Sequence, residues 1–294
     1  MLVVVSLLAW LQAAPAAAPA DYLADVRRLA ASTSNDERFD VLTTLLKERN
    51  VPFVVEEFTV EKPDPRDGRA RGRNIVVTLG TGAEDVVVGA HYDAVRLKDG
   101  MLGQGAVDNG ASSIMLVHLA AALRGERLSA RVRLVWFDME ESGLIGSRRF
   151  VEAHKGDRIR AMLNYDINGY GDTVLFSEAP GGEDARLRRS MLETCAAEQI
   201  DCLRFQQFPN SDDRTFGRAK IPTLSLAMLP AAEAHQLWLM LHAAKDSGLA
   251  SGFAPSIFRT IHTADDVVEK VDGASMSRVG QLALALIRRL TAAR

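Results

Sequence analysis

The stretch DVVVGAHYD, residues 85–93, is a run of small and apolar residues that ends in a histidine and an aspartate. A second stretch of the same kind, VRLVWFDMEESG at residues 132–143, runs from apolar residues into acidic ones. Continuous apolar runs of this length are typical of strands buried on both faces of a sheet. Both stretches therefore predict central strands whose carboxyl ends carry polar side chains.

Strand-like and helix-like segments alternate along the chain on both sides of these two stretches. The expected strands are residues 52–60, 74–79, 85–90, 132–137, 161–167, 173–176 and 222–228. The expected helices are residues 110–123, 142–153, 183–198, 231–244 and 275–293. This alternation predicts an α/β fold: a single-domain three-layer α/β/α sandwich with a central, mostly parallel mixed sheet.

One loop-rich segment, residues 62–73, lies between the first two expected strands and is rich in proline, glycine and charge. It is interpreted as a hairpin or a crossover rather than a domain boundary, and its arginines as a solvated face. No repeat and no Gly/Ser-rich linker divides the sequence.

The composition is that of an ordinary globular protein, with 47% hydrophobic and 25% charged residues in a chain of 294. The formal net charge of -3 gives no basic excess, so no nucleic-acid partner is predicted. With two cysteines and six histidines in all, a metal site would have to draw on carboxylates.

The N-terminal segment differs from the rest, because residues 2–20 carry no charged side chain. An apolar run is followed by an Ala- and Pro-rich stretch and then by Asp21. This order predicts a signal peptide at residues 1–20, a mature domain at 21–294, and an exported protein, periplasmic or secreted. The alternative is an uncleaved membrane anchor, for which the strongly apolar run is short.

The two cysteines, Cys195 and Cys202, are separated by six residues and are close enough to close a small loop. In an oxidising compartment this spacing is compatible with a disulfide. Two free buried thiols are the alternative, and the sequence leaves both states open.

Five histidines and acids follow the expected strands or stand at the turns beside them. They are His91, Asp108, Glu141, Asp166 and His262. Each alone has an ordinary structural explanation, such as a turn or a helix cap. Together they lie where open α/β sheets form sites, and they suit zinc or a related divalent ion. Five ligands exceed the three of one catalytic zinc but fit two metals if one carboxylate bridges.

Three further acids stand beside these residues. Asp93 lies two positions after the first histidine in an extended segment, so it can accept that ring's N–H. Asp266 is expected to do the same for His262. Because Glu140 and Glu141 are adjacent, they project in different directions, so one can bind metal while the other acts as general base.

With these residues, the sequence resembles the M28 family of zinc metallopeptidases, which includes secreted bacterial aminopeptidases. The matching motifs are HYD at His91, AVDN at Ala106, MEESGLIGS at Met139, NYDING at Asn164 and HTADD at His262. They stand in the family's order over about 175 residues. The resemblance implies a zinc exopeptidase fold and an aminopeptidase that acts on peptide substrates.

The resemblance also implies two zinc ions per chain. It assigns one ion to His91, Asp108 and Asp166, and the other to Asp108, Glu141 and His262, with Asp108 bridging. It assigns Glu140 as the general base and Asp93 as the acid that supports the first histidine.

Two positions depart from the family's pattern. Many members have Ser-Asp-His before the late strand, where this chain has Asp213 in place of the histidine. Some secreted members place a tyrosine hydroxyl where this chain has Phe208. These departures leave the oxyanion donor and the substrate pocket open.

Three alternative functions remain. The first is that of the glutaminyl cyclases, which resemble M28 peptidases but use one zinc ion and transfer rather than hydrolyse. The uninterrupted segment from Glu141 to Ser147 and the complete ligand set argue against that reading. The second is a non-catalytic binding protein, and the third is a two-metal hydrolase that acts on different amides or on phosphoesters.

Overall fold

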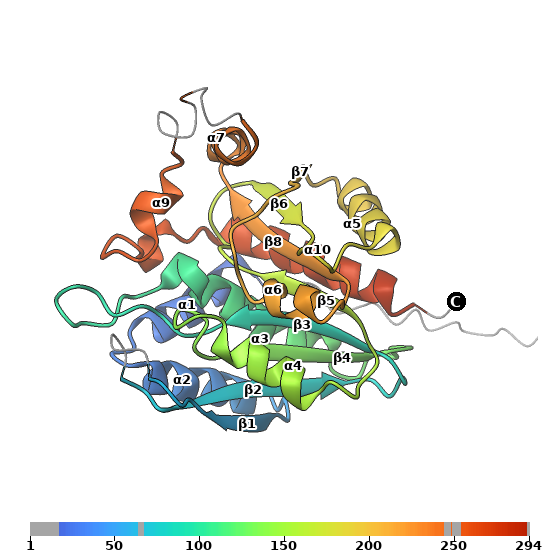
Figure 1. Cartoon of the computed structure of the whole chain (residues 1–294), viewed down its shortest axis with the longest axis horizontal. Coiled ribbons are helices and arrows are strands. Elements are labelled where there is room, and N and C mark those ends of the chain that lie inside the picture. Colours follow the sequence, from blue (N-terminus) through green and yellow to red (C-terminus); the bar gives the residue numbers. More distant parts are fainter. Residues whose placement is uncertain (1–17, 64–67, 244–247, 249–253, 293–294) are drawn as a thin grey trace, which may run out of the picture.

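The computed structural model describes residues 18–63, 68–243, 248 and 254–292. Its strands are β1 (Val54–Thr59), β2 (Arg71–Leu79), β3 (Asp85–His91), β4 (Arg131–Phe137), β5 (Ile159–Tyr165), β6 (Thr173–Ser177), β7 (Cys202–Arg204) and β8 (Thr223–Leu229). They form one sheet in the order β1-β2-β4-β3-β5-β8-β6-β7 (Figure 1).

The four central strands, β4, β3, β5 and β8, run parallel to one another. The pairs β1–β2, β2–β4 and β6–β8 are antiparallel, and the short edge strand β7 runs parallel to β6. The predicted mixed sheet with a parallel centre is confirmed. The three-residue strand β7 was not predicted, because so short a run carries no periodicity.

The helices are α1 (Pro19–Ala30), α2 (Asn35–Glu48), α3 (Ala111–Leu123), α4 (Ile145–Ala153), α5 (Ala185–Glu198), α6 (Asp213–Arg218), α7 (Ala231–His242), α9 (Ile257–Thr260) and α10 (Gly273–Leu290). Two short turns are η1 (Ala106–Gly110) and η3 (Val268–Lys270). The five predicted helices are present, whereas α1, α2, α6 and α9 are additional.

The helices form a layer on each face of the sheet (Figure 1). Alternate residues of β4 show the two faces: Trp136 joins the large core, to which α1, α2, α3 and α10 contribute, and Phe137 joins a smaller one. In that smaller core the Phe137 ring packs against Phe150 of α4 and Phe216 of α6, with ring centroids 5.8 and 6.1 Å apart. The period of two in a strand thus produces the predicted three-layer sandwich.

The loop-rich segment after β1 closes a hairpin, one of the two connections that the sequence left open, because β1 and β2 pair antiparallel from Val54 opposite Val76 to Thr59 opposite Arg71. The prediction that its arginines form a solvated face is wrong for Arg69. That side chain is 16% exposed and its Nη1 lies 2.9 Å from an oxygen of Asp138, at the end of β4. A buried carboxylate within reach withdraws this arginine from solvent.

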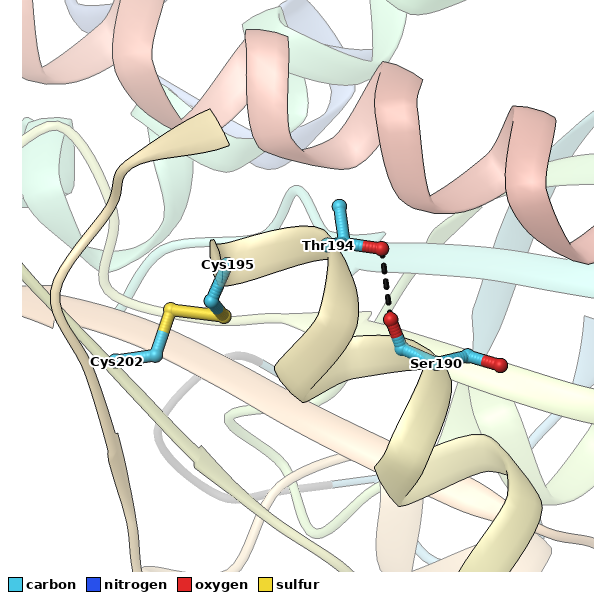
Figure 2. The surroundings of a disulfide bond; sticks show 4 residues. All are labelled: Ser190, Thr194, Cys195 and Cys202. Carbon is cyan, nitrogen blue, oxygen red and sulfur yellow. Dashed lines mark hydrogen bonds between the residues drawn. A yellow bond between two sulfur atoms is a disulfide. The ribbon is translucent and has the colours of Figure 1, made fainter. Parts of the chain in front are cut away.

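The two cysteines form a disulfide, which Figure 2 shows between the last turn of α5 and the strand β7. Cys195 is buried, and its neighbour Thr194 donates its hydroxyl hydrogen bond to the carbonyl of Ser190 at 2.7 Å (Figure 2). Of the two states that the sequence left open, the bonded one is present. The bond ties α5 to the edge of the sheet.

Among the described residues, one helical stretch, Ala106–Leu123, is long and apolar enough to span a membrane by length and composition. It is 89% buried inside the fold, as expected of a core helix. Most of the predicted signal peptide, up to residue 17, lies outside the described residues.

Candidate metal centre

The five predicted ligands meet at the carboxyl end of the parallel strands. His91 is the last residue of β3, Asp166 follows β5, and Glu141 lies in the turn after β4. Asp108 comes from η1, and His262 follows α9. Because β4, β3 and β5 are adjacent and parallel, their carboxyl ends share one edge of the sheet. Asp108 and His262 come from outside the sheet and lie beside this edge.

Asp108 lies between the two histidines and turns one carboxylate oxygen toward each. Its Oδ1 is 3.2 Å from Nε2 of His91, and its Oδ2 is 3.2 Å from Nε2 of His262. Asp166 Oδ1 lies 3.5 Å from the first histidine's Nε2, and Glu141 Oε2 lies 3.2 Å from the second's. The result is two three-residue groups that share Asp108, each with its candidate ligand atoms within 4.8 Å of one another.

The histidines and carboxylates of these groups stabilise each other's charged forms. Hydrogen bonds to Asp108 and Glu141 raise the pKa of His262 to about 11. Burial favours the neutral ring of His91, yet the charge of Glu140 and hydrogen bonds to nearby carboxylates raise its pKa well above the usual value. Burial also opposes ionisation of Asp108, but hydrogen bonds from both histidines lower its pKa. Imidazoles and carboxylates in this arrangement suit a divalent ion such as zinc.

Glu140 stands next to the ligand groups, forming a third cluster with His91 and Glu141. Burial raises the pKa of Glu140 well above its usual range, against the opposing positive charge of His91. A buried carboxyl group with a raised pKa can take up and release a proton near neutral pH. Glu141 also belongs to the group with Asp108 and His262, whereas Glu140 is grouped only with His91 and Glu141.

Asp93 is 1% exposed and has a second role that the sequence did not indicate. Its Oδ1 lies 3.5 Å from Nδ1 of His91, which is closer, at 3.2 Å, to the main-chain oxygen of Asp93. The carboxylate accepts the main-chain N–H groups of Glu140 at 3.0 Å and Glu141 at 3.1 Å. Asp93 therefore fixes the backbone of both glutamates as well as facing the histidine.

Asp266 is placed differently from the expectation that it would orient His262. Its carboxylate accepts the main-chain N–H of Val107 at 2.7 Å and that of Asp108 at 3.1 Å. It thus holds the main chain of Asp108. The His262 side chain is 54% exposed and lies at the open rim of the centre.

Asp138 stabilises the turn that carries the two glutamates, a role that the sequence did not indicate. Asp138 accepts both the guanidinium of Arg69 and the N–H of Arg73, at 2.9 and 3.0 Å. It also accepts the N–H of Met139 at 2.8 Å, where the chain adopts a positive φ of 57°. Burial raises the pKa of Asp138 to about 6. No sequence motif marks this contact, because it depends on the hairpin that brings Arg69 to β4.

The two positions that depart from the family's pattern are ordered parts of the fold. The Phe208 ring packs edge-on against Phe205, with centroids 5.5 Å apart, and its carbonyl accepts a hydrogen bond from Arg214 at 2.8 Å. Asp213 begins α6 and is 2% exposed, and burial raises its pKa to about 7. The negative charge of Asp166 adds to that shift, so Asp213 lies within electrostatic reach of the ligand groups.

The model of peptidase family M28 matches residues 74–287, more than half of the chain. The chain belongs to peptidase family M28. All five candidate ligands of this M28 chain fall within the matched range, whereas α1 and α2 precede it.

Comparison of this M28 chain with curated proteins finds leucine aminopeptidases. It is 35% identical over 111 residues to "Leucine aminopeptidase 1" of Arthroderma otae, a match that covers 33% of this chain and 29% of that protein. A probable leucine aminopeptidase of Arthroderma benhamiae matches at 32% over 108 residues, or 28% of its length. The M28 chain thus matches less than a third of the length of these relatives.

Solved structures share the fold over nearly the whole M28 chain. A zinc aminopeptidase from Bacillus subtilis superimposes with a TM-score of 0.71 at 12% identity, covering 94% of this chain and 97% of that one. A glutaminyl cyclase from Fimbriiglobus ruber gives 0.72 at 15% identity, covering 95% and 97%. At these identities the likeness establishes the fold alone.

Proposed function

We propose that this M28 chain is a zinc-dependent aminopeptidase that removes N-terminal residues from peptides by hydrolysis. The observation that carries the proposal is the pair of ligand groups that share Asp108, with Glu140 beside them. The family membership and the names of the curated relatives support the same reading.

The donor set fits two zinc ions per chain. His91, Asp108 and Asp166 would hold one ion, and Asp108, Glu141 and His262 would hold the other. When bound, zinc supplies a Lewis acid that polarises a carbonyl group and acidifies water. The two oxygens of Asp108 already face different histidines, which is the arrangement that a bridging ligand requires.

The chain's own residues supply the proton transfers. Glu140 accepts the proton of the attacking water and then delivers it to the leaving amine, a task to which its raised pKa is suited. Asp93 holds the backbone of Glu140 and Glu141 in place during these transfers. The ion pair between Arg69 and Asp138 also stabilises the turn that carries Glu140 and Glu141.

We infer that the substrates are peptides with an apolar first residue such as leucine. The names of the curated relatives support this class. A panel of aminoacyl anilides that differ in the first side chain, together with a phosphoester, tests it. Equal or faster cleavage of the phosphoester would contradict the peptide assignment.

We also infer export, with residues 1–20 as the signal peptide and 21–294 as the catalytic domain. The uncharged N-terminal segment supports cleavage and export. The Cys195–Cys202 disulfide supports an oxidising compartment such as the periplasm or the extracellular space. N-terminal sequencing of the exported protein gives the cleavage site.

A second candidate is a glutaminyl cyclase, the activity that is named for the Fimbriiglobus ruber structure with the same fold. It would use one zinc ion and release ammonia from an N-terminal glutamine instead of cleaving a peptide bond. Incubation with a Gln-initiated peptide separates the two, because a cyclase leaves the chain length unchanged.

The substitution Glu140→Gln tests the proposed mechanism. Because the amide cannot accept the proton, turnover should fall by about 10²–10⁴-fold while the zinc content stays at the wild-type level. Glu152→Gln, on the exposed surface of α4, is the matched control and should retain activity. Wild-type turnover in the Glu140 variant would show that the base is another residue.

A further inference from the structure

Arg38 of α2 is completely buried directly behind the candidate metal centre. Its Nε donates to the carbonyl of Tyr92 at 2.5 Å, Nη1 to that of Gln104 at 2.6 Å, and Nη2 to that of Gly105 at 3.2 Å. Arginine is almost never fully buried unless its charge is compensated. One guanidinium thus joins two chain segments that are close to candidate ligands.

Both segments lead directly to candidate ligands. Tyr92 stands between His91 and Asp93, at the end of β3. Gln104 and Gly105 form the turn that enters η1, which carries Asp108. Main-chain hydrogen bonds from Leu97 to Met101 and from Gly103 to Val95 join the two segments as a hairpin, and the guanidinium adds three contacts at the end of this hairpin that is nearest the candidate ligands.

The turn is closed tightly around the guanidinium. Gly105 has a φ of +51°, and a Cβ at this residue would meet the oxygen of Asp108 at 2.7 Å and Nη2 of Arg38 at 3.6 Å. The same Gly105 carbonyl accepts the N–H of Gly110 at 2.9 Å. A side chain at residue 105 would therefore displace the turn that presents the Gly105 carbonyl to Arg38.

The positive charge of Arg38 is compensated by the acids of the centre rather than by water. Burial lowers the pKa of Arg38 to about 10, while Asp93, Asp266 and Asp108 oppose that shift. The guanidinium therefore stays charged at neutral pH. It is a fixed positive charge close to the carboxylates of Asp93, Asp108 and Asp266.

The helix that carries Arg38 also contacts the first segment through Asn35. Its Nδ2 donates to the carbonyl of Ala94 at 3.1 Å, and its Oδ1 accepts the N–H of Ala94 at 2.9 Å. Two side chains one turn apart on α2 therefore hold residues 92–94. This helix lies before the range that the family model matches, so no motif of the centre includes it.

We propose that Arg38 is a positioning residue of the metal centre, which ties the His91–Asp93 segment to the Asp108 turn through three main-chain hydrogen bonds. This proposal rests on the proposed function, because it takes His91 and Asp108 as zinc ligands. It gives α2, which also packs into the large core, a second task at its first turn.

The test compares Arg38→Lys and Arg38→Met in the full chain. Lysine keeps the charge but cannot span the three carbonyls, and methionine removes both charge and donors. The measurements are zinc affinity by competition with a chelator, kcat and KM for leucine anilide at saturating zinc, and urea unfolding. Arg49→Met is the control, since Arg49 at the end of the same helix pairs with Asp25 away from the centre.

Loss of positioning should weaken zinc binding about 10–100-fold in Arg38→Lys, the range seen when groups that orient ligands are removed. It should also lower kcat about 10–100-fold at saturating zinc with KM within threefold. The Arg49 variant should be less stable but keep wild-type zinc affinity. A merely structural Arg38 would move only the unfolding curve.

Wild-type zinc affinity and kcat in Arg38→Lys would overturn the assignment, as would an equal loss of affinity in the Arg49 control. If Arg38→Met does not fold, the lysine variant alone decides. A wild-type chain that neither binds zinc nor cleaves the anilide would overturn the proposed function and this inference together. A wild-type chain that does both, beside an unaffected lysine variant, overturns only the inference.

Discussion

Replacing Asp93 with asparagine isolates the contact that holds the two glutamates. Burial opposes ionisation of Asp93, but the hydrogen bond and charge of His91 lower its pKa below the usual range, so it is an anion at neutral pH. Its two oxygens accept the N–H groups of Glu140 and Glu141. Asparagine keeps the shape but offers one oxygen and one NH₂ group, so one of those N–H groups faces a donor.

The magnitude follows from these two bonds. A hydrogen bond to a charged acceptor contributes about 1.5–3 kcal/mol, and a buried N–H left without an acceptor costs about 1–3 kcal/mol. We therefore expect Asp93→Asn to lower the free energy of unfolding by about 2–4 kcal/mol in the zinc-free protein. Displacement of Glu140 by a fraction of an ångström to about 1 Å should lower kcat by about 10–100-fold.

The assay is urea unfolding of the zinc-free chain together with steady-state hydrolysis at saturating zinc. Asp184→Asn is the matched control, because a single oxygen of Asp184, Oδ1, accepts the N–H groups of both Arg186 and Leu187 at the start of α5, so asparagine caps that helix equally well. That control should change the stability by less than about 0.5 kcal/mol. An Asp93→Asn variant within about 0.5 kcal/mol and twofold of wild type would refute the reasoning.

Two further predictions concern the scaffold. Replacing Cys195 and Cys202 with serine should lower the free energy of unfolding by about 2–3 kcal/mol, the value for a short closed loop, without altering zinc content; an unchanged urea midpoint would contradict it. His154 lies 2.9 Å from Glu56 and 2.8 Å from Asp157, and these hydrogen bonds raise its pKa, with burial opposing. The stabilisation that His154 contributes to the folded state is therefore complete below the unfolded pKa of about 6.5 and is lost as pH rises through the folded pKa. His154→Gln should lower the free energy of unfolding more at about pH 5.5 than at about pH 9, and a loss independent of pH would contradict this.

The apolar runs were sufficient to predict the centre of the fold. Residues 85–90 and 132–137 became adjacent parallel strands, and His91, Glu140 and Glu141, which follow these runs, lie in one cluster. This worked because buried parallel strands are marked by composition, and their carboxyl ends share an edge. The first helix was missed although Tyr22, Val26 and Leu29 are buried at helical spacing, a signal that the sequence did contain.

The partners of the site residues were out of reach of the sequence. Arg38 stands in the polar stretch NDERFD, which is typical of an exposed helix face, yet it is fully buried. Its burial depends on three carbonyls from distant parts of the chain, which no local pattern encodes. The same holds for Asp93, whose contact with Glu140 requires the turn at Met139 to adopt a positive φ.

The most direct test of the central claim is a titration of the metal-free protein with zinc while the hydrolysis of leucine anilide is followed. Two ligand groups that share Asp108 predict activity that is absent without zinc and reaches its plateau at two equivalents per chain. Full activity at one equivalent, or cyclisation of an N-terminal glutamine with no hydrolysis at any zinc concentration, would contradict the account.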